Sequence, residues 1–280
     1  MRFKIKGKRI LITGMAGSIG SELLKQLAPN NKIFGLDFNE TGLFDLIEEY
    51  QQAKFWVHGR VGDIRDSKTV HDVFSDFKPQ FVFHAAAYKH VTPMEWYPIE
   101  AIHANVLGTH NLIDEAKRWE CLERFVFIST DKAVQSNSVM GATKRLCEIM
   151  VKNQGNGFVV VRFGNVLGSR GSVIPIWQKQ MDEGKPLTIT DERMERYFMT
   201  INEAVALVIK ATEFRGGEII VLDMGKPIKI IDLAKKIIED TKKGELKFIG
   251  IRPGELLGEK IMFAEEEKVA VKQGDFWIIK

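Results

Sequence analysis

The chain has 280 residues, a formal net charge of +3, and a composition of 45% hydrophobic and 28% charged residues, as in ordinary globular proteins. The length allows one large domain or two smaller ones, and the small, mixed charge argues against a nucleic-acid partner. No run reaches the roughly 18 apolar residues of a membrane span. Cys121 and Cys147 lack metal or redox spacing, so a cytoplasmic location and no metal site are expected.

Short apolar stretches alternate with longer stretches of helical period up to residue 164. Strands are predicted at residues 8–14, 32–37, 54–59, 80–86, 124–130 and 158–164, and helices at 21–28, 41–50, 67–77, 103–119 and 143–153. Because the strands lack polar alternation and a helix follows each, they indicate a parallel sheet covered on both faces. This doubly wound α/β fold is Rossmann-like and binds ligands beyond the carboxyl ends of its strands.

The pattern changes after Gly164. Residues 165–199 are rich in loops, and residues 200–224 resemble a return to the sheet. Residues 225–280 then contain a predicted helix at 230–241 and a strand at 245–250. We therefore expect a first domain at 1–164, joined by 200–224, and a smaller C-terminal lobe built from 165–199 and 225–280.

A glycine-rich segment at residues 14–20 follows the first strand and opens the first helix. Its Gly-x-x-Gly-x-x-Gly spacing is typical of the short-chain dehydrogenase/reductase superfamily. Glycines permit a tight turn, so that a pyrophosphate rests on the free N–H groups of the helix N-terminus. The segment predicts a dinucleotide site at Gly14, Gly17, Ser18, Ile19 and Gly20, the alternative being a glycine-rich turn without a ligand.

Three further segments of the first domain suit the cofactor. Asp37 ends the second strand, where a carboxylate accepts the ribose hydroxyls of NAD and repels the 2′-phosphate of NADP, so NAD is favoured over NADP. Asp63 and Ile64 suit an adenine contact, although Asp63 is equally suited to cap the next helix. Ala85 and Ala86 leave room for a flat cofactor, or for close packing.

The segment STDKAVQSNSVMGATK, residues 129–144, follows the fifth strand. Many dinucleotide enzymes that oxidise alcohols carry a tyrosine four residues before the lysine of this segment, and that tyrosine takes the hydroxyl proton. Here Lys144 is present, and on a helix it shares a face with Met140, which occupies the tyrosine position. A thioether holds no proton, so the chemistry needs another base.

The motifs GxxGxxG, HAAA, NVLG, STDK, MGATK, RFGNVLGSRGSVIP, RYFMT and RPGE occur in this order. From end to end the chain resembles extended short-chain dehydrogenases of nucleotide-sugar metabolism and, more narrowly, the CapD-like polysaccharide biosynthesis group, the UDP-N-acetylglucosamine 4,6-dehydratases. The resemblance implies oxidation at sugar C4, loss of water across C5 and C6, and hydride return to C6. It also implies that NAD stays tightly bound and is recycled. Methionine at position 140 is itself a feature of this branch.

The resemblance assigns catalytic roles to Thr130, Asp131, Lys132 and Lys144. Asp131 would protonate the departing C6 hydroxyl, and Lys132 would remove the C5 proton. Lys144 would hold the nicotinamide ribose. The base for the C4 hydroxyl is left open among Asp131, Lys132 and an ordered water. Without the surrounding motifs, the Asp-Lys pair would be read as a solvated turn.

The resemblance also predicts residues for the UDP end of the substrate, in a nucleotide-sugar-binding lobe. Arginine suits a diphosphate because its planar donors engage two oxygens at once. The predicted residues are Lys89, Asn165, Arg170, Ser172, Arg252 and Glu255. Taken singly, the two arginines would more often be surface charges.

Two other functions stay open. One is an epimerase or a C5-inverting dehydratase on the same scaffold, and the other is a non-catalytic NAD-sensing protein. The resemblance further implies a homo-oligomer. Many relatives carry an N-terminal membrane region, so the chain is either a natural short form or an excised catalytic portion.

Overall fold

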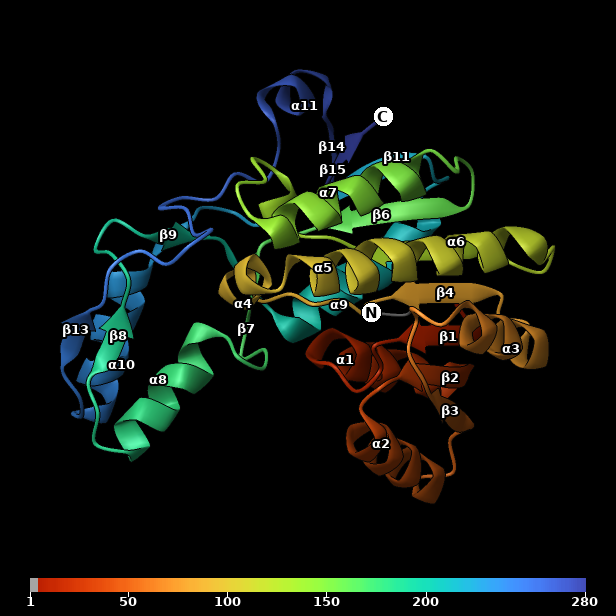
Figure 1. Ribbon diagram of the computed structural model, residues 1–280, viewed down its shortest axis with the longest axis horizontal. Coiled ribbons are helices and arrows are strands. Elements are labelled where there is room, and N and C mark those ends of the chain that lie inside the picture. The colour runs from red at the N-terminus through yellow and green to blue at the C-terminus, as the bar shows by residue number, and fades with distance from the viewer. Residues whose placement is uncertain (1–4) are drawn as a thin grey trace.

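The computed structural model describes residues 5–280, and within them the main sheet has the strand order β14-β15-β11-β6-β5-β4-β1-β2-β3 (Figure 1). The strands that pair in parallel are β1 (Arg9–Thr13), β2 (Lys32–Asp37), β3 (Val57–Val61), β4 (Phe81–His84), β5 (Arg124–Ile128), β6 (Phe158–Arg162) and β11 (Glu218–Leu222). β15 (Phe276–Ile279) is antiparallel to β11, and β14 (Val271–Gln273) is antiparallel to β15.

The strand order confirms the predicted doubly wound α/β fold. β4 and β6 are buried at every residue, as expected of strands that helices cover on both faces. The chain runs outward from β1 through β2 to β3 and then returns to β4 on the other side of β1. This reversal creates a switch point at the carboxyl ends of β1 and β4, where such sheets bind ligands.

Helices cover both faces of the sheet (Figure 1). The apolar sides of α1 (Ser18–Leu27), α2 (Glu40–Gln52) and α9 (Ile201–Lys210) pack on one face. Those of α3 (Ser67–Phe77), α6 (Gly108–Arg118) and α7 (Val139–Lys152) pack on the other. Along the chain, the segment from β4 to α6 contains α4 (Val91–Trp96), α5 (Pro98–Ala101) and a π-helical turn (Ile102–Leu107). Over residues 5–280, none of the helices combines the length and apolar character needed to cross a membrane.

A smaller lobe lies at the left of Figure 1, beside the main sheet. It contains α8 (Val173–Asp182), β8 (Leu187–Ile189), α10 (Ile230–Thr241) and β13 (Leu246–Phe248), with β8 parallel to β13. Its core surrounds Trp177, whose side chain is fully buried. Two short strand pairs join this lobe to the rest: β7 (Asn165–Leu167) with β10 (Phe198–Thr200), and β9 (Glu195–Arg196) with β12 (Ile228–Lys229).

The last part of the chain corrects the expected extent of the smaller lobe. All of residues 225–280 were assigned to it, but after α11 (Ala264–Val269) the strands β14 and β15 complete the main sheet. Ile279 lies opposite Ile219 of β11, and Phe276, Ile278 and Ile279 are buried. The physical reason is that the backbone of β15 pairs with the exposed edge of β11, while these apolar side chains extend both cores.

Candidate active site

The glycine loop at residues 14–20 connects β1 to α1 and packs directly on the chain after β4. Gly14 has a left-handed backbone, with φ of 70°, and a Cβ there would lie 2.7 Å from the Ala86 nitrogen. A Cβ at Gly20 would lie 2.1 Å from the Gly14 carbonyl oxygen. Both positions therefore require glycine. The turn leaves the first N–H groups of α1, at Ser18 and Ile19, at the helix N-terminus that a phosphate group favours.

A cavity of about 520 Å³ opens beside this loop, within the size range of small-molecule and cofactor sites. It is lined by the small residues after β4, by the ends of β2 and β3, and by part of the loop after β7. Among the residues predicted for the cofactor, the lining contains Gly14, Gly17, Asp37, Asp63, Ile64, Ala85 and Ala86. The tertiary structure thus brings together segments that follow four different strands of the sheet.

The Asp37 carboxylate is held rigidly at the edge of this cavity. Oδ2 accepts a hydrogen bond from the Ala16 nitrogen at 2.8 Å, and Oδ1 accepts one from the Asn39 nitrogen at 2.9 Å. The side chain is buried, with 8% of the residue exposed. A fixed negative charge here suits ribose hydroxyls and opposes a 2′-phosphate.

Asp63 is not the cap of the following helix, which settles one alternative left open by the sequence. The N-cap of α3 is Asp66, whose side chain accepts a hydrogen bond from the Lys68 nitrogen. Asp63 is instead paired with Arg65, at 2.7 Å. Burial raises the pKa of Asp63, but the hydrogen bonds from Arg65 outweigh it, so that the pKa lies below its usual value. Arg65 also pairs with Glu100 at 2.7 Å, so carboxylates neutralise the cation that lines the cavity.

The helix α7 carries Met140 and Lys144 into the interior. Lys144 Nζ donates to the Ile128 carbonyl oxygen at 2.6 Å, at the end of β5. Burial lowers the pKa of Lys144 from 10.5 to about 8. Met140 is 2% exposed and packs in an apolar cluster with Met94 and Ala101. The position of the usual tyrosine is therefore an apolar contact here.

The predicted acid-base pair lies in a single 3₁₀ turn directly after β5. Asp131 is fully buried, and its Oδ1 accepts hydrogen bonds from Thr130 Oγ1 and Lys132 Nζ, each at 2.9 Å. Its Oδ2 is buried and has no hydrogen-bond partner in the described part of the chain. A buried oxygen in this state is poorly satisfied within the protein and is free to accept a hydrogen bond from a bound ligand. The burial of Asp131 therefore excludes the alternative that Asp131 and Lys132 form a solvated turn.

Residues from distant segments complete the cluster around Lys132. Lys132 Nζ donates to Asn165 Oδ1 at 3.1 Å, so Asn165 lies beside the acid-base pair. Glu259 Oε1 lies 3.8 Å from Lys132 Nζ and 3.6 Å from the Arg196 guanidinium. Burial raises the pKa of Glu259 above its usual value. Sequence reasoning missed Glu259 and Arg196, because a glutamate four residues after RPGE carries no local sign of burial.

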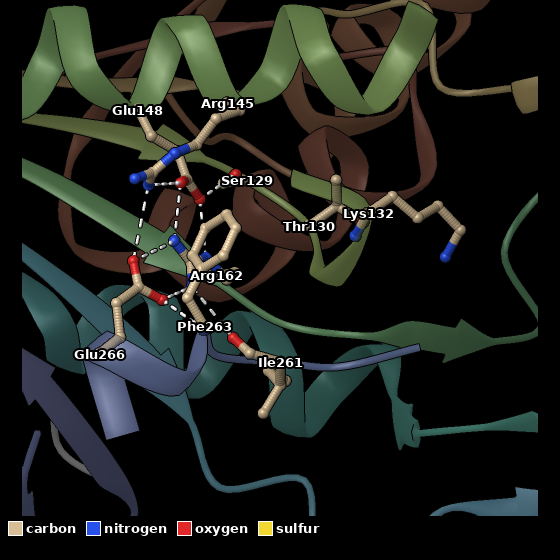
Figure 2. Close-up of polar contacts among 9 residues, drawn as sticks. All are labelled: Ser129, Thr130, Lys132, Arg145, Glu148, Arg162, Ile261, Phe263 and Glu266. Atoms are coloured by element: carbon tan, nitrogen blue, oxygen red, sulfur yellow. Dashed lines mark hydrogen bonds and ion pairs between the residues drawn. The ribbon is translucent and has the colours of Figure 1, made fainter. Parts of the chain in front are cut away.

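A second buried charge cluster lies behind the acid-base pair and fixes the elements that carry it (Figure 2). Arg162 of β6 donates to Glu148 of α7 at 2.7 and 2.8 Å, and to Glu266 of α11 at 2.6 and 3.1 Å. Burial lowers the pKa of Arg162, but the bonds to these carboxylates raise it above its usual value. Ser129 Oγ donates to Glu148 at 2.7 Å, and Figure 2 shows Lys132 pointing away from this cluster.

The residues predicted for the UDP end fall into two groups. Lys89 Nζ donates to the Arg170 carbonyl oxygen at 2.7 Å, and the backbone nitrogen of Arg170 donates to Ser18 Oγ at 3.0 Å. Arg170 also lines the cavity beside the glycine loop, so this group meets the predicted phosphate loop. Ser172 is the N-cap residue of α8.

The second group lies on the other side of the acid-base turn. Arg252 is exposed, and its backbone nitrogen donates to Glu255 Oε2 at 3.3 Å. Glu255 lines a separate cavity of about 580 Å³, together with Gln135 and Asn137 from the loop that follows Lys132. The structure therefore separates Arg170 and Glu255 into different cavities.

The parallel sheet, its glycine loop and the smaller lobe define an extended short-chain dehydrogenase/reductase fold. Pen from Bacillus thuringiensis has this fold, with a TM-score of 0.92 and 35% identity over 98% of this chain and 88% of Pen. The UDP-glucose 4-epimerase of Thermus thermophilus, solved with NAD, gives a TM-score of 0.77 and 25% identity over 91% of this chain and 90% of that one.

Sequence similarity identifies the family. The family model for polysaccharide biosynthesis proteins matches residues 10–280, and the chain belongs to this family. The capsular polysaccharide biosynthesis protein CapD of Staphylococcus aureus is 45% identical over 278 residues, which are 94% of this chain and 46% of CapD. The chain thus spans about half the length of this curated relative. The predicted family resemblance is confirmed.

Proposed function

We propose that the chain is a nucleotide-sugar 4,6-dehydratase that uses NAD and acts on UDP-N-acetylglucosamine or a close relative. The membership of a polysaccharide biosynthesis family supports a nucleotide-sugar-modifying enzyme. The observation that carries the finer proposal is the pairing of the buried Asp131 with the partly exposed Lys132 at the carboxyl end of β5. A 4,6-dehydratase needs an acid and a base at neighbouring carbons, and this pair supplies one of each.

The residues that line the cavity suit NAD, as does Lys144 of α7, which lies outside this lining. The glycine loop can hold the pyrophosphate, Asp37 the adenosine ribose, and Lys144 the nicotinamide ribose. NAD, when bound, supplies an acceptor for the sugar C4 hydride and returns that hydride to C6. The carboxylate of Asp37, already fixed by two backbone N–H groups, favours NAD over NADP.

The proton balance of the reaction explains how the site works with Met140 in place of tyrosine. Asp131, as a carboxylate, takes the proton of the C4 hydroxyl. As an acid it then gives this proton to the departing C6 hydroxyl, which leaves as water. Lys132, as an amine, takes the C5 proton and returns it to C5 at the end. The sugar loses one water, and both side chains recover their starting protonation states, so that a separate tyrosine is unnecessary.

The main alternative is a 4-epimerase on the same scaffold, as the similar Thermus thermophilus structure is a UDP-glucose 4-epimerase. Epimerisation at C4 requires no acid at C6 and no base at C5. The close pairing of Asp131 with Lys132, at 2.9 Å, therefore favours elimination. A protein that only senses NAD would need neither group.

Incubation with UDP-N-acetylglucosamine deuterated at C4 tests the proposal. A dehydratase gives a product that has lost one water and carries the deuterium in its C6 methyl group. An epimerase gives a product of unchanged mass with deuterium at C4. Bound NAD without turnover of this or related UDP-sugars would favour the sensing protein. Mass spectrometry and proton NMR distinguish the three outcomes.

A further inference from the structure

Glu259 is held beside the acid-base pair by anchors on both sides of it in the sequence. On one side, the Arg196 guanidinium donates to the carbonyl oxygens of Leu256 and Leu257, at 2.8 and 3.1 Å. On the other side, Arg162 donates to the Ile261 carbonyl oxygen at 3.0 Å (Figure 2). These two arginines come from the smaller lobe and from β6, so the position of Glu259 is fixed by the tertiary structure.

The surroundings of Glu259 are charged, although its side chain is only 4% exposed. Lys132 and Arg196 lie within 4.0 Å, and Asp131 and Glu255 are the other charged groups that act on it. A buried carboxylate contributes little net stability unless its partners are well placed. An ion pair with Arg196 at 3.6 Å does not by itself explain why Glu259 is buried, or why it lies close to Lys132.

We propose that Glu259 is a positioning residue that acts through Lys132. Lys132 lies between two carboxylates, with Asp131 at 2.9 Å and Glu259 at 3.8 Å. When Asp131 takes the C4 proton and becomes neutral, Glu259 continues to hold the side chain of Lys132. Its negative charge also stabilises the ammonium group that forms when Lys132 takes the C5 proton. This role rests on the proposed dehydratase function.

The test measures the free amine of Lys132 directly, so that it does not depend on turnover. The full chain is treated with a trace of acetic anhydride at pH ~7.5, near neutrality, where an ordinary lysine is almost wholly protonated. Acetylation of Lys132 is measured by peptide mass spectrometry relative to the exposed Lys235. In Glu259→Gln the shape is kept and the charge is lost. We expect Lys132 to be acetylated roughly ten-fold faster than in the wild type, because its ammonium form loses a stabilising charge.

Matched variants separate charge from structure. Glu259→Asp keeps the charge and should return the rate to within about two-fold of the wild type. Glu267→Gln removes an exposed carboxylate of the same segment and should leave the rate unchanged. Glu259→Met removes the charge with an apolar side chain of similar length, so that Lys132 should again be acetylated roughly ten-fold faster than in the wild type. This last variant keeps the proposal testable if Glu259→Gln fails to fold.

The outcomes distinguish this proposal from the proposed function. A wild-type rate of Lys132 acetylation in folded Glu259→Gln or Glu259→Met overturns the positioning role. If the charge variants behave as expected but the wild type does not dehydrate UDP-sugars, the positioning of Lys132 stands and the dehydratase proposal fails. If both hold, the pH profile of turnover should shift to lower pH in Glu259→Gln, because Lys132 then becomes a free amine at lower pH.

Discussion

Two buried charge clusters lie on either side of the turn after β5, and they differ in how completely their groups are paired. Around Arg162, the carboxylates of Glu148 and Glu266 and the Ile261 carbonyl oxygen accept hydrogen bonds between 2.6 and 3.1 Å. Around Lys132, Glu259 lies 3.8 Å away. Within residues 5–280, Asp131 Oδ2 is buried without a hydrogen-bond partner.

This difference separates a framework from a reactive site. In the saturated cluster, both carboxylates accept two hydrogen bonds from one arginine, whose guanidinium keeps its proton. An incompletely paired carboxylate in a buried site carries an unfavourable free energy that a hydrogen bond from a bound ligand relieves. The Arg162 cluster therefore fixes β6, α7 and α11, whereas the Asp131-Lys132 cluster is suited to exchange protons. Four predictions test this contrast.

The largest effect is expected from Arg162→Leu, which removes the centre of the saturated cluster. Glu148 and Glu266 would stay buried and keep only the partly exposed Arg145, at 3.1 and 3.5 Å, as a common partner. The free energy of unfolding should therefore fall by about 3–5 kcal/mol. Urea unfolding monitored by circular dichroism measures it. The control is Arg193→Leu, which breaks an exposed pair with Asp191 and should leave the midpoint unchanged. Equal midpoints for the two variants would remove the distinction between framework and surface pair.

Asp131→Asn should instead affect chemistry and leave folding largely intact. We expect kcat for UDP-N-acetylglucosamine to fall by about 10²- to 10⁴-fold, because an amide neither takes nor gives the transferred proton. The unfolding midpoint should change much less than in Arg162→Leu. A variant that keeps wild-type kcat would show that the proton moves through another group.

Lys144 provides a buried cation that donates to a carbonyl oxygen rather than to a carboxylate. Its pKa of about 8 in the folded chain lies below the ordinary 10.5, so the unfolded chain binds more protons between these values. Burial of this ammonium therefore destabilises the fold below about pH 8, and the penalty disappears as the pH rises toward 10.5. Compared with Lys144→Met, the wild type should gain about 1–3 kcal/mol between about pH 7 and 10.5.

Urea unfolding of both proteins at several pH values measures this difference. A constant difference across the range would mean that Lys144 keeps its ordinary titration in the fold. The comparison of the two proteins cancels the titration of the groups that they share.

The smallest effect is expected from Met140→Leu. Methionine and leucine have similar volumes, so the apolar cluster with Met94 and Ala101 should lose less than about 1.5 kcal/mol. Turnover should stay within about two-fold of the wild type, since neither side chain carries a proton. A large loss of kcat with unchanged stability would place part of the chemistry on this face of α7.

Local patterns in the sequence predicted much of the fold and part of the site. Strands such as β4 and β6 are apolar along most of their length because both of their faces are buried. This apolar run can be recognised in the sequence alone. The glycines at 14 and 20 were equally predictable, since the spacing itself reflects the close approach of the backbone. Lys132 beside Asp131 was found because the two are neighbours in the chain.

Other parts depended on contacts between distant residues. The strands β14 and β15 were assigned to the smaller lobe, because their partner β11 lies far earlier in the chain and no local pattern indicates the pairing. Arg162 and Glu266 are 104 residues apart, and each alone resembles an ordinary charged residue. The same is true of Glu259, whose burial raises its pKa only in the folded chain.

The sequence by itself determined the doubly wound sheet, the phosphate loop and the adjacent acid-base pair, because each is encoded by residues a few positions apart. Only the tertiary structure decided which charges are buried together. It joined Asn165, Arg196 and Glu259 to Lys132, and it enclosed Arg162 between two carboxylates. The physical reason is that burial and pairing of charges depend on long-range packing, which the local period of a sequence does not contain.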